Sequence, residues 1–493
     1  MYKDATIEEI NSLMQAAWKA YHLYRNIPLK QRAEFLRAIA REIGELGDEL
    51  LQVTARETNL PEARLRNERA RTQFQLNSYA DACEKGDWLE ARIDTAIPDK
   101  NPPKPDIRKM RVPVGPVVVF GAANFPYAYS TAGGDTASAL AAGCPVIVKA
   151  HPAHPATSDA VAGAILKAVA STGMPEGVFS HIHGVSTAVG RALVEHPLTK
   201  SVGFTGSFTG GKQLFDWANQ RPEPIPVFAE MSSINPVFLL PGKLNASAED
   251  LATLYTGSIT LGVGQFCTNP GLLIGMEGEG LSRFVSALGD AIRKQPPATM
   301  LHEGIARNYR EKKSMALSQP DVELLAETET APLEGQGDPV IATVKATDFI
   351  SNPRLHQEVF GPFSLLVSCR DAEEMLQVAR QLEGQLTVTL MATAEEILQF
   401  GELVEAVKDK CGRLILNGVP TGVEVCLSMQ HGGPFPASTD SRFGSVGADA
   451  IGRFTRPLAF QNWPDQLIPE PLRDANPLGI WRTVNNTLTQ SPV

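Results

Sequence analysis

The chain has 493 residues, of which 43% are hydrophobic and 20% are charged, and its formal net charge is −10. The length predicts two or three domains, and the composition is typical of a globular protein rather than a disordered or fibrous one. The negative charge argues against nucleic acid as a main partner, because phosphate binding needs a positive surface.

No apolar run reaches the length of a membrane span, and the six cysteines include no C-x-x-C pair. The N-terminus also lacks the apolar core of a signal peptide. We therefore expect a cytoplasmic protein that does not enter a membrane and has neither a disulfide framework nor a structural metal site.

The first 85 residues predict a layer of helices. Thr6 and Glu9 have the spacing of a capping box, and apolar residues recur after them at helical intervals. Further helical patterns cover about residues 30–57 and 61–85. Residues 93–111 are polar and rich in proline, which predicts an arm or ribbon, because proline is excluded from central strands.

From residue 117 the pattern becomes α/β. Short apolar runs alternate with helical patterns, as in parallel βαβ units. The predicted strands of this part are 117–120, 146–148, 178–181 and 202–204, with helices at 135–142, 158–172 and 187–195. A second set follows, with strands at 227–230, 236–240, 322–325, 340–344, 363–368 and 414–417 and helices at 246–261, 281–294, 371–382 and 394–408. Residues 429–449 are rich in Gly, Pro, Ser and Asp, 458–461 predict a last strand, and the tail is loosely patterned.

Cys267 stands in an unusual stretch, residues 261–271, where glycines surround the thiol and an Asn-Pro-Gly sequence follows it. Glycine weakens regular elements, so this composition favours close backbone approach to the thiol over core packing. Free cysteines are usually buried as small hydrophobic residues. The neighbours of Cys267 favour instead a nucleophile.

Several polar residues follow predicted strands, where ligands bind in open α/β sheets. Asn124 can donate its amide to an oxyanion, or it forms a turn before Phe125-Pro126. Lys149 can hold a ribose or a phosphate, or it is a solvated charge at a strand end. His151 and His154 stand next to prolines and lack a third ligand, so no metal site is predicted there.

Two glutamates offer carboxylates for catalysis or binding. Glu230 ends a predicted strand, where burial would raise its pKa and suit it as a general base, although such residues are often ion-paired. Glu358 is similar, and Phe360 beside it offers an apolar platform.

Residues 204–213, Phe-Thr-Gly-Ser-Phe-Thr-Gly-Gly-Lys-Gln, fit the P-loop pattern G-x-x-x-x-G-K. However, Gln213 stands where a P-loop carries the Ser or Thr that binds magnesium. The same glycines would also let a dinucleotide pyrophosphate approach a helix N-terminus. Both interpretations stay open at this point.

Taken together and in chain order, these motifs resemble the NAD(P)-dependent aldehyde dehydrogenase superfamily over nearly the whole chain. The matches are Asn-Phe-Pro at Asn124, the lysine at Lys149, Phe-Thr-Gly-Ser with its second glycine at Gly211, the strand-end Glu230, Gly-Gln-x-Cys at Cys267 and Glu-x-Phe-Gly-Pro from Glu358. Each motif is modest alone, but six in the same order are highly specific.

The resemblance implies a role for each of these residues. Cys267 would attack the aldehyde as a thiolate, the Asn124 amide and the backbone N–H of Cys267 would hold the oxyanion, and Glu230 would activate water. The residues that would hold the cofactor are Lys149, Gly206, Ser207 and Gly211 at the adenosine ribose and pyrophosphate, and Glu358 and Phe360 at the nicotinamide ribose and ring.

The resemblance also implies an α/β aldehyde dehydrogenase fold that assembles into a homodimer or homotetramer. The expected parts are a Rossmann-like dinucleotide-binding domain (1–92 and 114–229), an oligomerisation ribbon (93–113 and 454–465), an α/β catalytic domain (230–430), a return segment to the cofactor domain (431–453) and a C-terminal tail (466–493).

Pro152 stands where the family often has an acidic ribose ligand, and the missing carboxylate favours NADP, with NAD as the alternative. The stretches after Phe125, Lys149 and Glu230 are similar to a branch containing 2-oxoglutarate semialdehyde (2,5-dioxopentanoate) dehydrogenases and an NADP-dependent fatty aldehyde dehydrogenase. The favoured reaction is oxidation of 2,5-dioxopentanoate to 2-oxoglutarate through a cysteine thiohemiacetal and thioester. The alternatives are a medium- or long-chain aldehyde dehydrogenase, a P-loop nucleotide hydrolase and a catalytically silent assembly subunit.

Overall fold

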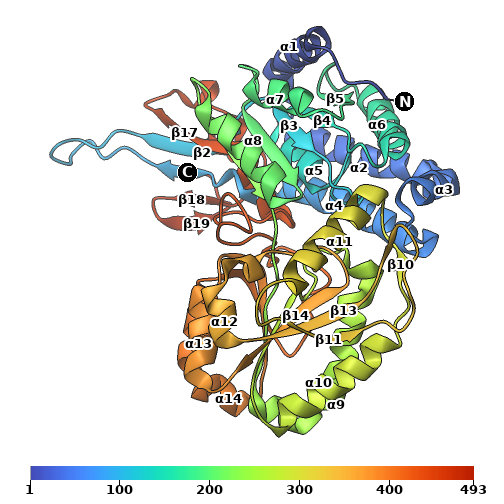
Figure 1. Ribbon diagram of the computed structural model, residues 1–493. Coiled ribbons are helices and arrows are strands. Elements are labelled where there is room, and N and C mark those ends of the chain that lie inside the picture. Colours follow the sequence, from blue (N-terminus) through green and yellow to red (C-terminus); the bar gives the residue numbers. More distant parts are fainter. Residues whose placement is uncertain (1) are drawn as a thin grey trace.

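The computed structural model describes residues 2–493 as two α/β units and a β-ribbon that lies beside the first of them (Figure 1). One unit contains a five-stranded sheet of order β5-β4-β3-β6-β7, and the other a seven-stranded sheet of order β11-β13-β14-β9-β8-β15-β16. Separate apolar clusters fill the two units. None of the helices formed by residues 2–493 combines the length and apolar composition that a bilayer crossing requires.

The first unit has a fully parallel sheet covered by helices. Its strands are β3 (Val117–Phe120), β4 (Val146–Lys149), β5 (Phe179–Ile182), β6 (Ser201–Thr205) and β7 (Val227–Glu230). The helices are α1 (Ile7–Tyr24), α2 (Leu29–Glu45), α3 (Gly47–Thr58), α4 (Glu62–Lys85), α5 (Gly134–Ala142), α6 (Pro155–Ser171), α7 (Thr187–Glu195) and α8 (Phe208–Gln220). The single helix predicted over 30–57 is wrong, because Gly47 takes a left-handed φ of 61° and separates α2 from α3.

The order of this sheet reverses at β3, which is where ligands of such sheets bind. The chain builds β3, β4 and β5 outward and then returns to the other side of β3 with β6 and β7. Ligands of open parallel sheets bind beyond the carboxyl ends of the strands at such a reversal. The loop with Asn124 follows β3, and the N-terminus of α8 follows β6, so both border the reversal.

The second unit has a sheet in which only β11 runs antiparallel to its neighbour. Its strands are β8 (Val237–Leu239), β9 (Leu272–Met276), β11 (Glu323–Glu327), β13 (Val340–Lys345), β14 (Phe363–Cys369), β15 (Gln385–Met391) and β16 (Cys411–Leu416). Its helices are α9 (Pro241–Thr260), α10 (Glu279–Arg293), α11 (Glu303–Leu317), α12 (Ala346–Ser351), α13 (Ala372–Gln381), α14 (Ala394–Gln399) and α15 (Gly401–Lys408), and a two-stranded sheet pairs β10 (Ala298–Thr299) with β12 (Gln336–Gly337). Neither β15 nor α11 is predicted from the sequence, and the helix expected over 394–408 divides at Phe400.

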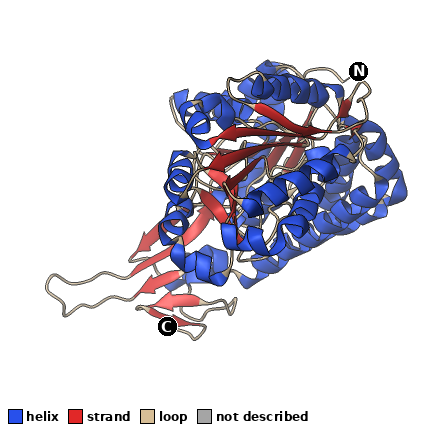
Figure 2. Cartoon of the chain, turned by 60° about the horizontal axis from the view of Figure 1, so that its bottom comes forward, coloured by secondary structure: helices blue, strands red, loops and turns tan. Residues whose placement is uncertain are grey.

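The ribbon is a five-stranded sheet of order β17-β2-β1-β18-β19. It consists of β1 (Arg92–Asp94), β2 (Ile107–Pro113), β17 (Thr455–Gln461), β18 (Arg482–Val484) and β19 (Thr487–Thr489). Figure 2 shows the loop between β1 and β2 projecting beyond the body of the molecule. The loosely patterned tail thus contributes two strands to the same sheet as the proline-rich arm.

Candidate active site

Cys267 follows a tight turn that ends α9. This turn, Leu261–Gly264, carries three consecutive left-handed residues, Gly262, Val263 and Gly264, with φ values of 55°, 59° and 63°. A side chain at Gly264 would collide with the backbone of Gly361, so glycine lets the two segments touch. The contact places the cysteine loop against the segment that carries Glu358 and Phe360. The close backbone approach expected from the glycines is therefore a contact between these two motifs.

The thiol of Cys267 lies beside a histidine and a glutamate. The Sγ atom is 3.6 Å from Nε2 of His431, and the same nitrogen is 3.0 Å from Oε1 of Glu230. All three groups present their reactive atoms within 4.8 Å of one another. Ser445 donates a hydrogen bond of 2.9 Å to the other oxygen of Glu230. His431 and Glu230 are both buried, so the arrangement is shielded from water.

Electrostatics in this cluster differ from the expectations for isolated residues. Burial by itself would raise the pKa of Glu230, but the charge of His431 and hydrogen bonds from His431, Ser445 and Cys267 lower it below the usual value. The prediction of a raised pKa for Glu230 is therefore wrong. Burial, the charge of Glu230 and its hydrogen bond raise the pKa of Cys267 well above its usual value. The cysteine thus rests as a thiol. His431 can take the proton of Cys267 only in its neutral form, and once protonated its charge stabilises the carboxylate of Glu230.

Asn124 lies next to the cysteine loop. Its Nδ2 donates to the carbonyl oxygen of Gln265 at 3.2 Å, two residues before Cys267. Arg64 donates to the carbonyl oxygen of Asn124 at 2.7 Å, and its guanidinium lies 5.1 Å and 4.9 Å from the ring centres of Phe125 and Phe266. These contacts hold the side-chain amide of Asn124 beside the loop that carries Cys267.

The residues expected at the pyrophosphate and adenosine ribose gather along the edge of the first sheet. Ser207 caps α8, and its Oγ accepts a hydrogen bond of 3.2 Å from the backbone N–H of Gly210. A Cβ at Gly211 would lie 2.6 Å from Cγ of Met231, so only glycine lets the helix pack this closely. Gly206 and Ser207 are exposed in front of this helix N-terminus, and Lys149 ends β4.

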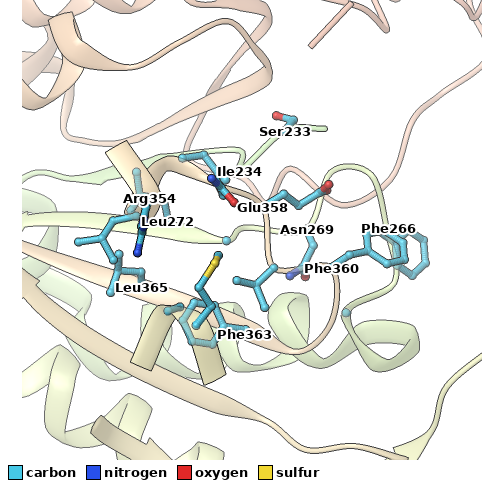
Figure 3. Close-up of a pocket in the computed structure, with 17 residues that line it drawn as sticks. Ser233, Ile234, Phe266, Asn269, Leu272, Arg354, Glu358, Phe360, Phe363 and Leu365 are labelled. Carbon is cyan, nitrogen blue, oxygen red and sulfur yellow. The ribbon is translucent and has the colours of Figure 1, made fainter. Parts of the chain in front are cut away.

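Glu358 and Phe360 line a pocket on the second unit together with Ser233, Phe266 and Asn269 (Figure 3). Burial raises the pKa of Glu358 to about 7, although hydrogen bonds from Ser232 and Ser233 oppose the shift. Because Phe266 and Asn269 flank Cys267 in the chain, the pocket borders the nucleophile. The structure therefore brings Glu358 and Phe360 close to the cysteine loop. In the sequence these two residues follow Cys267, whereas the pyrophosphate residues precede it.

Other candidates have structural roles in the described chain. Lys212 forms an ion pair of 2.7 Å with Asp216 one turn along α8. His154 is buried with its Nε2 2.9 Å from the carbonyl oxygen of Ala122, and its ring lies 5.5 Å from that of His151. All six cysteines are free thiols, of which only Cys426 is exposed.

Sequence reasoning missed His431, which lies in the glycine-rich segment expected only to return to the cofactor domain. Its position depends on backbone pairing over long distances: Ser445 N–H donates to the carbonyl oxygen of His431, and Glu230 pairs with Ser438. The available signal was a histidine before two glycines in a chain with a candidate nucleophilic cysteine.

Comparison with known proteins places these observations in a family. The model of the aldehyde dehydrogenase family matches residues 1–455. The chain belongs to the aldehyde dehydrogenase family. It is 50% identical over 475 residues to alpha-ketoglutaric semialdehyde dehydrogenase 2 of Azospirillum brasilense, covering 96% of this chain and 90% of that protein. It is 45% identical over 493 residues to alpha-ketoglutaric semialdehyde dehydrogenase of Acinetobacter baylyi, covering 100% and 93%.

Solved structures of this family have the same fold. Lactaldehyde dehydrogenase from Escherichia coli matches with a TM-score of 0.78 at 20% identity, over 93% of this chain and 92% of that one. A 1-pyrroline-5-carboxylate dehydrogenase from Thermus with bound NAD matches with a TM-score of 0.78 at 21% identity, over 93% and 86%. The predicted aldehyde dehydrogenase fold is confirmed, and the protein is an NAD(P)-dependent enzyme that oxidises aldehydes. The P-loop hydrolase and the silent subunit are wrong interpretations.

Proposed function

We propose that this aldehyde dehydrogenase oxidises 2,5-dioxopentanoate to 2-oxoglutarate with NADP. The proposed substrate rests on one observation. The chain is 45–50% identical over nearly its whole length to two enzymes named for alpha-ketoglutaric semialdehyde, which is another name for 2,5-dioxopentanoate. The geometry supports the reaction, because a thiol, a proton acceptor and a carboxylate converge on one buried point.

The chemistry begins at the thiol. Nε2 of His431 accepts the proton of Cys267, and the sulfur adds to the aldehyde carbon to form a thiohemiacetal. The amide of Asn124 and the backbone N–H of Cys267 donate hydrogen bonds to the resulting oxyanion. Glu358 and Phe360 would hold a nicotinamide here, which would supply the hydride acceptor, so that Cys267 would be left acylated as a thioester. Glu230 then takes a proton from water, and the hydroxide adds to the thioester. The C–S bond breaks to release the acid, and His431 returns its proton to the sulfur.

The residues at the edge of the first sheet fit a dinucleotide. The exposed N-terminus of α8 presents backbone N–H groups to a pyrophosphate, and Gly211 allows the close packing that such a site needs. The side-chain ammonium of Lys149 makes no hydrogen bond or ion pair within residues 2–493. This cation is suited to the adenosine ribose with its 2′-phosphate, and Pro152 contributes no carboxylate to repel that phosphate. Glu358 and Phe360 would hold the nicotinamide ribose and ring.

We further propose that the ribbon pairs subunits, as a homodimer or a dimer of dimers. The ribbon and the segments beside it expose large apolar side chains, among them Trp463 (50% exposed), Trp481 (48%) and Leu488 (65%). Such a cluster favours association of copies. The same proposal divides the chain into a cofactor domain (1–92, 114–229), a ribbon (93–113, 454–465) and a catalytic domain (230–430), with 431–453 returning to the cofactor domain, while the tail (466–493) adds β18 and β19 to the sheet of the ribbon.

The experiment is a panel of kcat/KM values for 2,5-dioxopentanoate, pentanal and a long-chain aldehyde, each with NADP and NAD. We expect 2,5-dioxopentanoate with NADP to give the highest value. A higher value for either apolar aldehyde would contradict the substrate, and a large preference for NAD would contradict the cofactor assignment. Light scattering of the eluting protein would measure the oligomeric state.

A further inference from the structure

Two arginines from different parts of the chain hold the same loop, residues 420–423, near the active site. Arg71 on α4 donates through Nη1 to the carbonyl oxygen of Val423. Arg413 on β16 donates through Nη1 to Gly422 at 2.9 Å and through Nη2 to Pro420 at 2.7 Å. The carbonyl oxygens of this loop therefore hold both guanidinium groups in place, and they accept hydrogen bonds from only some of the N–H donors of each group.

The remaining donors of both arginines are buried and have no acceptor. Nε and Nη2 of Arg71, and Nε of Arg413, make no hydrogen bond within residues 2–493, and neither arginine forms an ion pair there. Glu68 lies between Arg64 and Arg71 on α4 and both arginines act on its charge, but its Oε1 accepts backbone N–H groups of Tyr127 and Ala128 and its Oε2 makes no hydrogen bond to either arginine. A buried donor without an acceptor is costly, and a charged one more so. The arginines are thus arranged for an anion that the described chain does not supply.

Tyr129 connects these arginines with the thiol. Its ring lies 6.0 Å from the ring of His431, which contacts Cys267, and its buried hydroxyl also makes no hydrogen bond within residues 2–493. Burial raises the pKa of Tyr129 well above its usual value, and the nearby charge of Arg71 opposes the shift. Burial lowers the pKa of Arg413, and the nearby Cys267 and Tyr129 oppose that shift. The arginines, the tyrosine hydroxyl and the thiol therefore lie near enough to one another to interact electrostatically.

We propose that Arg71 and Arg413 form a carboxylate subsite that binds the 2-oxo acid end of the substrate while its aldehyde lies at Cys267. This inference rests on the proposed function, because 2,5-dioxopentanoate has its carboxylate four carbon–carbon bonds from the aldehyde carbon. A guanidinium is planar, stays charged and offers paired donors to a carboxylate. The hydroxyl of Tyr129 can donate to the 2-oxo group next to the carboxylate.

The neighbouring arginines are less suited to this role. Arg64 also has one buried donor without an acceptor, but its other nitrogen holds Asn124 and its plane lies between two phenylalanine rings. Arg354 lines the pocket of Glu358 and Phe360, where its side chain is exposed (Figure 3). A solvated guanidinium already has water as its acceptor, so it gains less from a carboxylate than a buried one.

The test compares Arg71→Gln and Arg413→Gln with the unaltered protein on 2,5-dioxopentanoate and on pentanal, which has the same length and no carboxylate. The ratio of the two kcat/KM values should fall by about 10- to 100-fold in each variant, because each loses charged hydrogen bonds to the carboxylate. Arg41→Gln is the matched control, since Arg41 is an exposed arginine paired with Glu34 at 2.7 Å. It should leave the ratio unchanged.

The outcomes separate the subsite from the substrate. If the unaltered protein prefers pentanal, the proposed substrate is wrong. If it prefers 2,5-dioxopentanoate and the ratio does not fall in either variant, or both substrates lose activity equally, the subsite is wrong and the substrate stands. A fall in the ratio with Arg354→Gln instead would place the carboxylate in the pocket of Glu358.

A binding measurement covers the case in which a glutamine variant does not fold. In a Cys426→Ser background, 2-oxoglutarate should protect Cys267 from iodoacetamide, because the product occupies the same space. Arg71→Lys and Arg413→Lys keep a charge but lose the paired donors, and the concentration needed for protection should rise about tenfold. Unchanged protection, with NADP binding showing a folded protein, would overturn the proposal.

Discussion

His431 is the residue whose replacement tests the catalytic geometry most directly. His431→Gln keeps a polar side chain of similar reach but cannot take a proton from Cys267. The pKa of Cys267 is raised by burial and by the charge of Glu230, so little thiolate forms without an acceptor. Loss of a positioned base costs about 10²- to 10⁴-fold in rate. We expect kcat/KM to fall by that factor and the initial burst of NADPH to disappear, because acylation becomes the slow step.

The assay combines stopped-flow recording of NADPH with the rate of alkylation of Cys267 by iodoacetamide across pH. Cys426 is the one fully exposed cysteine, so both proteins carry Cys426→Ser to remove its reaction. His431→Gln should slow alkylation at neutral pH and move its pH profile toward alkaline values. An unchanged alkylation profile together with a preserved burst would refute the role of His431 as proton acceptor.

The same substitution has a consequence for stability that depends on pH. The pKa of Glu230 is lowered in the folded protein, so its ionisation stabilises the fold above the unfolded value of about 4.3 and this contribution is lost as pH falls through the folded value. Without His431, only the hydrogen bonds from Ser445 and Cys267 oppose the effect of burial on the pKa of Glu230, so this pKa rises. Each unit of that rise removes about 1.4 kcal/mol of the stabilisation present at neutral pH. Acid unfolding, followed by circular dichroism, should therefore begin at a higher pH.

Further predictions concern the water-activating carboxylate and the cofactor site. Glu230→Gln should preserve the burst of NADPH but stall release of the acid, and steady turnover at the normal rate would exclude Glu230 as the base. Burial raises the pKa of Glu358 to about 7, so its carboxylate is protonated below and ionised above that value. Because the ionised form accepts hydrogen bonds from ribose hydroxyls, the Kd for NADP should rise as pH falls from about 8 to about 6, and Glu358→Gln should abolish this dependence. Lys149→Met should raise the Kd for NADP by about tenfold or more and affect NAD less, as measured by fluorescence titration. Equal effects on both cofactors would place Lys149 away from the 2′-phosphate.

Residues at strand ends could be predicted because their signal is local. An apolar run followed by a polar residue and a glycine or proline marks the carboxyl end of a parallel strand, which locates Asn124, Lys149 and Glu230 in the same crevice. Cys267 was predictable for a similar reason, since the glycines around it weaken a regular element and indicate close backbone approach. The order of the strands in the sheet then places these residues at the same edge.

The parts that were missed depend on partners distant in the chain. His431 is 164 residues from Cys267, in a segment without periodicity. The strand β15 is central but carries buried polar side chains, and these bind the loop after Glu230: Gln385 accepts from Ser233 at 2.9 Å, and Thr387 donates to Asn235 at 3.0 Å. The pKa of Glu230 was predicted in the wrong direction for the same reason, because burial is visible in an apolar strand but the histidine that outweighs it is not.

The active site presents a thiol to one end of the proposed substrate and unpaired arginine donors to the other. At one end Cys267 is a protonated thiol, which is less prone to oxidation than a thiolate, with its proton acceptor 3.6 Å away. At the other end Arg71 and Arg413 have buried donors without acceptors. A dioxo acid supplies a carboxylate to the arginines and a carbonyl to the sulfur in one binding event. An aldehyde without a carboxylate leaves the arginine donors unpaired, so the two arginines favour the substrate that carries a carboxylate.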